Sequence, residues 1–339
     1  MQKRQLGSTG LEISFMGIGG IPLQRFDEKN AEEILLAAKE AGINFIDTAR
    51  GYTRSEELIG KALKKAGREN FVVATKAQSR DREGMKREIA LSMEKLDCGH
   101  IDLYQCHFVC KDEDLDKILG EGGAIEALEE AKREGVIRHV GVTSHNLGVA
   151  LRAIETGRFE TVQFPFNFIE EDGAKVFAAA KRRRMGTISM KPVGGGAIRN
   201  RGLSFRHIYS IGDSDCIIPG VDNAEQLREN AADIGDPPAP LTEEEKKRME
   251  DEKKLLGREF CRRCDYCQPC PKGIPISVIF TAKAYYERYD LKDWAIMKYK
   301  ACKANYLDCL KCGRCESKCP YGLPIRKMLE KTHELLGGK

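Results

Sequence analysis

Residues 71–108 read FVVATKAQSRDREGMKREIALSMEKLDCGHIDLYQCHF and contain one complete strand–helix–strand unit. Phe71–Thr75 and Ile101–Gln105 are short runs dominated by apolar residues, a pattern typical of buried strands. Between them, Arg82–Leu96 repeats its apolar residues at helical spacing. A strand, a helix and a second strand in this order predict two parallel strands joined by a crossover helix.

The same alternation recurs through the first 235 residues. The candidate strands are Phe15–Gly19, Asn44–Ile46, Phe71–Thr75, Ile101–Gln105, Ile137–Val142, Thr161–Phe164, Thr187–Met190 and Asp215–Ile218. The candidate helices between them include Glu28–Ala41, Arg54–Lys65, Arg82–Leu96, Gly123–Arg133, Gly148–Thr156 and Gly173–Arg183. Eight strands that alternate with helices favour a closed (β/α)8 TIM barrel over an open sheet, so we expect an α/β fold.

Two further segments frame this barrel. Arg4–Ser14 has glycines at its turn and predicts a hairpin that plugs the barrel floor. Asp236–Pro240 is rich in proline and predicts a stiff linker, and a helix capped by Thr242 and Glu245 follows it and ends near Gly257. We therefore expect a barrel at 1–235, a linker and helix at 236–257, and a small helical domain at 258–339, with a core built around Trp294 and nearby tyrosines.

The small domain contains nine of the thirteen cysteines, and eight of them form two tight runs. The first run is Cys261, Cys264, Cys267 and Cys270, followed by Pro271; the second is Cys309, Cys312, Cys315 and Cys319, followed by Pro320. Three thiolates two residues apart can surround one face of a 4Fe–4S cube, and a fourth before proline can reach a different cube. The spacing therefore favours two 4Fe–4S clusters, and the domain resembles an all-helical ferredoxin-like module.

The runs suit a crossed arrangement in which each contributes its last cysteine to the other's cluster. Cys270 would then join the cluster of the second run, and Cys319 would join that of the first. The first run has two residues rather than three before its last cysteine, so the crossed assignment is less secure there. Structural zinc is the alternative, but a third cysteine at the same short step fits it poorly. Disulfides fit less well still, because neighbouring C-x2-C thiols form strained bridges.

Composition excludes several other classes of function. A net charge of +4 is small for 339 residues and does not indicate a nucleic-acid partner. No apolar run approaches the roughly 18–20 residues that cross a bilayer, and the polar N-terminus predicts no secretory signal. We therefore expect a cytoplasmic protein without a membrane or nucleic-acid partner.

Four polar side chains follow the predicted strands at the end where barrel enzymes place their active sites. They are Asp47 and Tyr52 after the second strand, Lys76 after the third and His107 after the fourth. A tyrosine has an ordinary pKa of about 10, and an adjacent ammonium would lower it toward the range useful for proton transfer. A carboxylate would keep that lysine charged, and a histidine opposite could orient a carbonyl.

Ordered motifs make residues 3–232 resemble the aldo-keto reductase family. They are Leu6–Leu11, Phe45–Ala49 with Tyr52, Ala74–Lys76, Asp102–His107, Gly135–Arg138 leading to Gly141-Val142, and Ile218–Gly220 with Glu229-Asn230. The resemblance implies that Tyr52 is the general acid, that Lys76 and Asp47 tune it, and that His107 orients a small carbonyl substrate.

The resemblance also implies a nicotinamide cofactor, NAD or NADP, extended across the barrel mouth. By position, Ser144 and Gln163 would bind its carboxamide, and Glu229 and Asn230 its adenine end. The loops after strands seven and eight would hold its phosphates; they include Lys191, Gly194 and Gly220.

Three departures from the family pattern concern this cofactor. His145 stands where asparagine is common, and Met190 stands where an aromatic residue often stacks on the nicotinamide. Asp222 would repel the 2′-phosphate of NADP, although Arg228 could compensate from the following helix. The sequence leans toward NAD.

The two halves suggest three functions. In the first, the barrel is an NAD(P)H-dependent carbonyl reductase and the clusters brace the tail or sense redox state. In the second, the protein links a soluble electron carrier to reduction at the barrel, through a flavin such as FMN, because a hydride carries two electrons and a cluster passes one. In the third, the barrel has lost its activity and the tail is a docking module.

Overall fold

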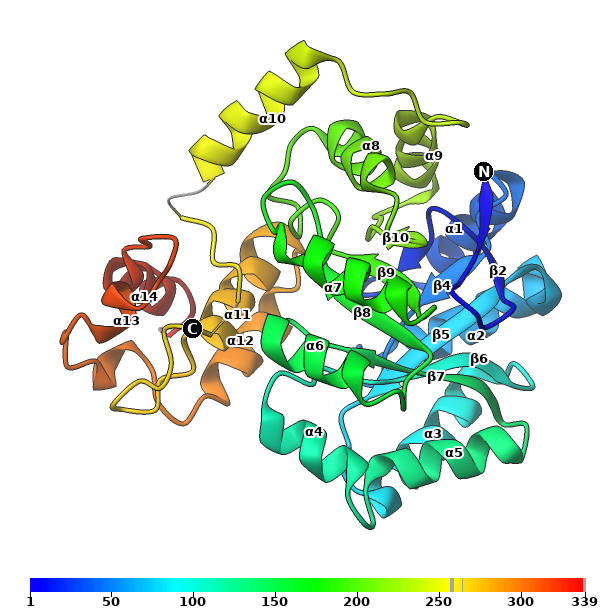
Figure 1. The fold of residues 1–339 in the computed structure, drawn as a ribbon, viewed down its shortest axis with the longest axis horizontal. Helices are drawn as coiled ribbons and strands as arrows, with labels where there is room; N and C mark the ends of the chain where they lie inside the picture. Colours follow the sequence, from blue (N-terminus) through cyan, green and yellow to red (C-terminus); the bar gives the residue numbers. More distant parts are fainter. Residues whose placement is uncertain (257–258, 264, 338–339) are drawn as a thin grey trace. The chain divides into compact units, whose positions relative to one another are not determined.

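The structure is a computed structural model that describes residues 1–256, 259–263 and 265–337 (Figure 1). Contacts between residues divide it into two compact units. The first comprises Met1–Val193 and Asn200–Leu241, and the second comprises Gly194–Arg199 and Thr242–Lys339. The predicted linker therefore groups with the first unit, and a short segment from the middle of the sequence groups with the cysteine-rich unit.

The first unit is built on eight parallel strands that pair in the order in which they occur along the chain. They are β3 (Ile18–Gly19), β4 (Phe45–Asp47), β5 (Val72–Ala77), β6 (Ile101–Cys106), β7 (Ile137–Thr143), β8 (Thr161–Pro165), β9 (Gly186–Met190) and β10 (Cys216–Ile218). Parallel bridges from Met16 to Ile217 and from Gly19 to Gly220 join the first strand to the last. The predicted barrel is confirmed, although the regular part of β3 is shorter than the expected strand.

Helices alternate with these strands and bury their apolar faces against them. They are α1 (Glu28–Glu40), α2 (Ser55–Ala66), α3 (Arg82–Leu96), α4 (Asp112–Leu119), α5 (Ala124–Arg133), α6 (Leu147–Glu155), α7 (Asp172–Arg182), α8 (Arg201–Ile211) and α9 (Ala224–Ile234), with single turns η1 (Pro22–Arg25) and η2 (Arg68–Asn70). Asp81 shows why α3 begins where it does, because its carboxylate accepts a 2.7 Å hydrogen bond from the backbone of Gly84. The six predicted helices are present.

The predicted hairpin is also present, as antiparallel strands β1 (Lys3–Gln5) and β2 (Glu12–Ser14). Leu6 and Ile13 of this hairpin are fully buried in an apolar cluster with side chains from inside the barrel, including Leu103 and Ile188. Gly7 packs directly against Gly186 at the start of β9, where an added Cβ atom would lie 2.2 Å from backbone nitrogen. The hairpin therefore closes the end of the barrel at which the strands begin.

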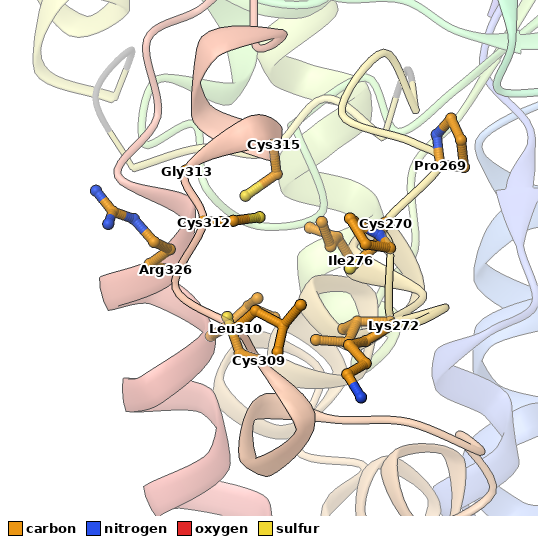
Figure 2. Close-up of a pocket in the computed structure, with 13 residues that line it drawn as sticks. Pro269, Cys270, Lys272, Ile276, Cys309, Leu310, Cys312, Gly313, Cys315 and Arg326 are labelled. Carbon is orange, nitrogen blue, oxygen red and sulfur yellow. The ribbon is translucent and has the colours of Figure 1, made fainter.

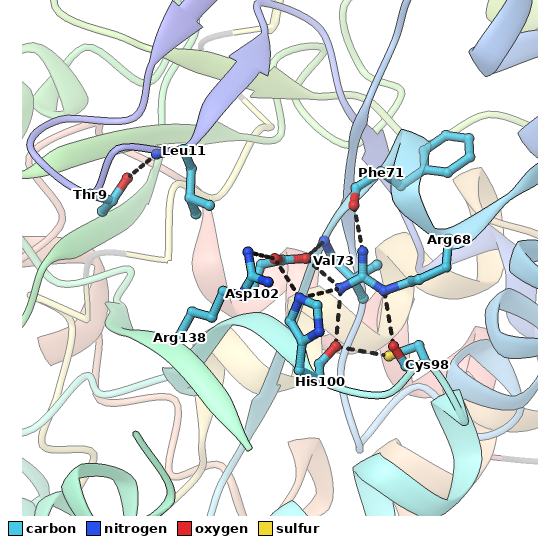
Figure 3. A network of polar contacts seen from close by, with 9 residues as sticks. All are labelled: Thr9, Leu11, Arg68, Phe71, Val73, Cys98, His100, Asp102 and Arg138. Carbon is cyan, nitrogen blue, oxygen red and sulfur yellow. Dashed lines mark hydrogen bonds and ion pairs between the residues drawn. The ribbon is translucent and has the colours of Figure 1, made fainter. Parts of the chain in front are cut away.

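A charged network lies at the same end, around Asp102 near the start of β6 (Figure 3). Its carboxylate accepts hydrogen bonds of 2.6 Å from Arg68 and 2.8 Å from the backbone of Val73, and lies 3.2 Å from His100 and 3.7 Å from Arg138. Asp102 and Arg138 both belong to the family-like motifs. Their positions show that these motif residues hold strand starts together.

The second unit is helical. It contains α10 (Glu243–Leu256), α11 (Ile276–Arg288), α12 (Lys292–Lys300), η3 (Tyr306–Asp308), α13 (Arg314–Ser317) and α14 (Ile325–Leu336). The predicted cap of α10 is confirmed, since Thr242 and Glu245 exchange backbone-to-side-chain hydrogen bonds of 2.9 and 3.2 Å. The predicted helix end at Gly257 lies outside the described residues.

The expected core of Trp294 and nearby tyrosines is confirmed only in part, because Tyr299 belongs to the core and Trp294 does not. The buried cluster of this unit is mainly aliphatic, with Ile276, Ile279 and Leu329 nearly inaccessible, and it draws on α11 and α14. Trp294 is only half-buried and packs against Tyr285 with ring centroids 4.5 Å apart. Aliphatic side chains of α11 and α14 fill most of the interior, and the Trp294 indole lies outside this cluster.

In the described part of the chain, no helix has the length and apolar character needed to cross a membrane.

Candidate active site and cysteine centre

A buried ion pair forms the centre of the barrel mouth. Lys76 near the end of β5 donates a 2.6 Å hydrogen bond to Asp47, the last residue of β4, and a 2.7 Å bond to the carbonyl oxygen of Thr48. Gln105 and Gln163 donate to the two carboxylate oxygens of Asp47 at 3.2 and 3.5 Å. Four elements of the barrel therefore fix this pair, and Gln105 is a contributor that the sequence did not reveal.

Burial dominates the electrostatics of the pair. The Asp47 and Lys76 side chains are 3% and 1% exposed. Burial raises the pKa of Asp47, and its hydrogen bonds and the Lys76 charge oppose that rise. Burial likewise lowers the pKa of Lys76, and the nearby Asp47 carboxylate opposes this change by raising it. The site thus holds its ammonium in an environment where losing a proton is easier than in water.

Tyr52 lies close to this pair, and His107 lies beside Tyr52. The Lys76 ammonium is 5.1 Å from the centroid of the Tyr52 ring, and the Tyr52 and His107 rings meet edge to face at 5.8 Å. Tyr52 is 9% exposed and His107 is half-buried. The structure therefore brings together the four residues that the sequence singled out.

Two of the side chains expected to bind the cofactor contain buried acceptor atoms that receive no hydrogen bond from the described residues. The Oε1 atom of Gln163 and the Oδ1 atom of Asn230 are buried and accept no hydrogen bond from any residue that the structure describes. Ser144 directly follows β7 and is buried. Its backbone N–H donates to the carbonyl of Gln163 at 3.1 Å, and its hydroxyl donates to the carbonyl of Asn146 at 3.2 Å. A buried acceptor without a donor is costly, so Gln163 and Asn230 fit a ligand that supplies N–H groups.

Other residues expected to contact the cofactor form ion pairs with neighbouring side chains. Glu229 pairs with Arg201 at 3.0 Å, and Arg228 pairs with Glu40 at 3.1 Å. Asp222 forms an ion pair with Arg25. Arg25 therefore stands beside the carboxylate that was expected to repel a 2′-phosphate, a cation that the sequence alone did not suggest.

The remaining expected positions fall on the loops at the strand ends. Met190 is the last residue of β9 and is 8% exposed, and Lys191 follows with a φ of 56°. The ring of His145 lies 5.1 Å from that of Phe108. Gly220 bridges to the first barrel strand, whereas Gly194 groups with the second unit.

The second cysteine run and the last cysteine of the first run line one pocket. Figure 2 shows the side chains of Cys309, Cys312, Cys315 and Cys270 directed toward the space between them. Among the described residues, no three cysteine, histidine or acidic side chains gather closely enough to hold a single metal ion. The donor set, four thiols spread around one space, fits the cube that the sequence assigned to these residues.

The first three residues of the two cysteine runs share a local backbone conformation, which together with the downstream sequence indicates an internal repeat. The backbone N–H groups of Arg263 and Lys311 donate to Cys261 and Cys309 at 3.4 Å, with φ values of 60° and 54°. Downstream, CPKGIPI at 270–276 matches CPYGLPI at 319–325, and each segment leads into a helix. Sequence inspection could have found this repeat, since corresponding residues are 48 or 49 positions apart.

The end of the second run also lies beside the first run. Arg262 stacks on the ring of Tyr321 at 3.8 Å, and Lys318 donates to the carbonyl of Gln268 at 3.2 Å. Tyr321 follows Cys319 by two residues, so Cys319 belongs to a segment that contacts the first run. Cys264 lies outside the described residues.

A model of the aldo/keto reductase family matches residues 15–210. This chain belongs to the aldo/keto reductase family. A model of a 4Fe-4S dicluster domain matches residues 260–324. The chain is thus an oxidoreductase with a C-terminal iron–sulfur domain, as the sequence predicted.

Known relatives match the barrel portion. Over 218 residues, the chain is 31% identical to the uncharacterized oxidoreductase YqkF of Bacillus subtilis, covering 60% of this chain and 68% of YqkF. It is 31% identical over 222 residues to L-galactose dehydrogenase of Arabidopsis thaliana, with the same shares. It is 29% identical over 199 residues to the NADH-specific methylglyoxal reductase of Escherichia coli, covering 50% of this chain and 60% of that protein.

Solved structures share the fold. Aldo-keto reductase AKR11C1 from Bacillus halodurans superposes with a TM-score of 0.64 at 24% identity, covering 74% of this chain and 96% of that structure. This similarity supports the barrel architecture.

Proposed function

We propose that this protein reduces a small carbonyl compound with NADH or NADPH at the mouth of the barrel. The observation that carries the proposal is the buried Asp47–Lys76 pair with Tyr52 and His107 beside it. When bound, the nicotinamide supplies a hydride to the carbonyl carbon. Tyr52 delivers a proton to the carbonyl oxygen, Lys76 supports that phenol electrostatically, and His107 orients the oxygen.

Residues of this chain also support the cofactor assignment. Oε1 of Gln163 is buried without a donor, and a carboxamide N–H would supply one. Asn230 offers a second such acceptor for an adenine amino group. The Asp222 carboxylate would repel a 2′-phosphate, and the neighbouring Arg25 is already engaged in an ion pair with Asp222. We therefore propose a modest preference for NADH.

The test is consumption of NADH and NADPH by anaerobically purified protein, with methylglyoxal and a panel of small aldehydes as substrates. Tyr52→Phe should lower kcat at least a hundredfold while leaving iron content unchanged. Tyr209→Phe is the matched control, because that hydroxyl only donates to Gln2 at 2.8 Å. Equal loss in both variants, or no turnover in the wild type, would contradict the proposal.

A second function, electron exchange with a soluble carrier, is favoured by one observation. Cys312, which lines the pocket of the second cysteine run, is exposed. A cluster at this place would lie near the surface, where a one-electron donor can reach it. Coupling to hydride chemistry at the barrel would need a two-electron converter such as a flavin, and analysis of the organic cofactor in purified protein tests for one.

A further inference from the structure

The second cysteine run lies in a strongly positive part of the chain. Residues 298–327 contain eight lysines and arginines but two acidic residues, a net charge of +6, whereas the whole chain carries +4. Lys272, Lys311 and Arg314 are exposed and form no ion pair with any described residue. A bound cluster with its thiolates adds a net charge of about −2, so the surface would stay positive.

Two exposed apolar side chains lie within this positive part of the chain. Leu307 and Leu310, on either side of Cys309 in the sequence, are 73% and 61% exposed. Leu310 lines the same pocket as Cys312, which is itself exposed (Figure 2). Exposed apolar side chains among charged ones are a composition that suits a protein–protein contact.

The first half of the repeat shows that this exposure is specific to the second half. Arg262 is the counterpart of Leu310, and the Tyr321 ring packs against it at 3.8 Å. Arg263 is the counterpart of Lys311, and it is only 8% exposed. Arg262 is therefore in contact with Tyr321 and Arg263 is buried, whereas their counterparts Leu310 and Lys311 in the second run are exposed.

We propose that this surface, defined as Lys272, Leu307, Leu310, Lys311 and Arg314, docks an acidic one-electron carrier protein over Cys312. The inference rests on the electron-exchange function proposed above. One electron leaves the reduced carrier and enters the oxidised cluster of the second run; no bond breaks and no proton moves. The positive surface attracts the carrier, and the two leucines fix its position.

The experiment measures how fast the clusters of anaerobic, full-length protein bleach after mixing with reduced flavodoxin, an acidic carrier, in a stopped-flow spectrophotometer. The wild-type rate should fall about tenfold between 50 and 300 mM salt, because screening weakens the attraction. Lys311→Glu/Arg314→Glu and Leu310→Ser should each slow bleaching about tenfold at low salt. The matched controls are Lys29→Glu/Lys65→Glu and Leu91→Ser, at exposed residues of the barrel.

Dithionite, a small reductant that needs no docking surface, should bleach all variants alike. A salt-independent rate, or surface variants as fast as the controls, would overturn the proposal, and so would the absence of bleaching by either reductant. Cytochrome c, a basic carrier, should not bind in a parallel titration. The assay contains no nicotinamide and no carbonyl compound, so its outcome is independent of the reductase proposal.

Discussion

Lys76 donates a 2.6 Å hydrogen bond to Asp47, and both side chains are almost inaccessible to water. Each charge is therefore tolerated only because the other is present. This dependence makes the pair a test of stability as well as of catalysis.

Removing one partner of the pair should be more harmful than removing both. Lys76→Met leaves the Asp47 charge buried and should lower the free energy of unfolding of the barrel by about 3–5 kcal/mol. The double variant Asp47→Leu/Lys76→Met should recover most of that loss. Urea unfolding followed by far-UV circular dichroism measures this, since the single tryptophan, Trp294, lies in the other unit. A double variant no more stable than Lys76→Met would contradict the expectation.

Pairs of cysteine variants can separate a crossed from an uncrossed cluster arrangement. Wild-type protein should contain about eight iron atoms, and Cys270→Ser should lower that number to about four. Adding Cys309→Ser should remove no more iron if the two thiols serve the same cluster, whereas adding Cys261→Ser should remove nearly all of it.

Cys302 supplies the control for that experiment, because it lies in the same unit but outside both runs. Cys302→Ser should keep its full iron and sulfide content. Loss of all iron on combining Cys270→Ser with Cys309→Ser would indicate that each run holds its own cluster.

Cys106 should be inert toward alkylation. Burial raises its pKa to about 12, so at pH 8.5 less than about one thiol in a thousand would be the reactive thiolate. We expect iodoacetamide to label the half-buried Cys110 of native protein and to spare Cys106, as measured by peptide mass spectrometry. Unfolding in urea should make both react, and labelling of Cys106 in native protein would mean that β6 opens readily.

Asp102→Asn should damage the fold and spare the chemistry. The carboxylate holds Arg68 and the backbone of Val73 at the strand starts, so its loss should cost about 2–4 kcal/mol of unfolding free energy. Asp97→Asn breaks only an exposed pair with Lys64 and should cost less than about 1 kcal/mol. A specific fall in kcat for Asp102→Asn at a temperature where it is folded would contradict this structural role.

Local patterns account for what the sequence predicted well. Strand and helix alternation, together with residues at strand ends, was enough to bring Tyr52, Lys76 and Asp47 to one place. The role of Gln105 was not predicted, because its hydrogen bond to Asp47 depends on which side chains of β6 point into the barrel. The aliphatic part of the small unit's core was also missed, because the contact between the apolar faces of α11 and α14 depends on tertiary packing.

The repeated sequence of the two cysteine runs bears on how each set of cluster ligands is completed. In the proposed crossed arrangement, each copy of the repeat contributes three thiols to one cube and its fourth thiol to the other. An isolated copy would therefore reach a full set of ligands only by associating with another molecule of itself. In that arrangement, two tandem copies complete both sets of ligands within one polypeptide, and the exposed Cys312 leaves the second set accessible from solvent.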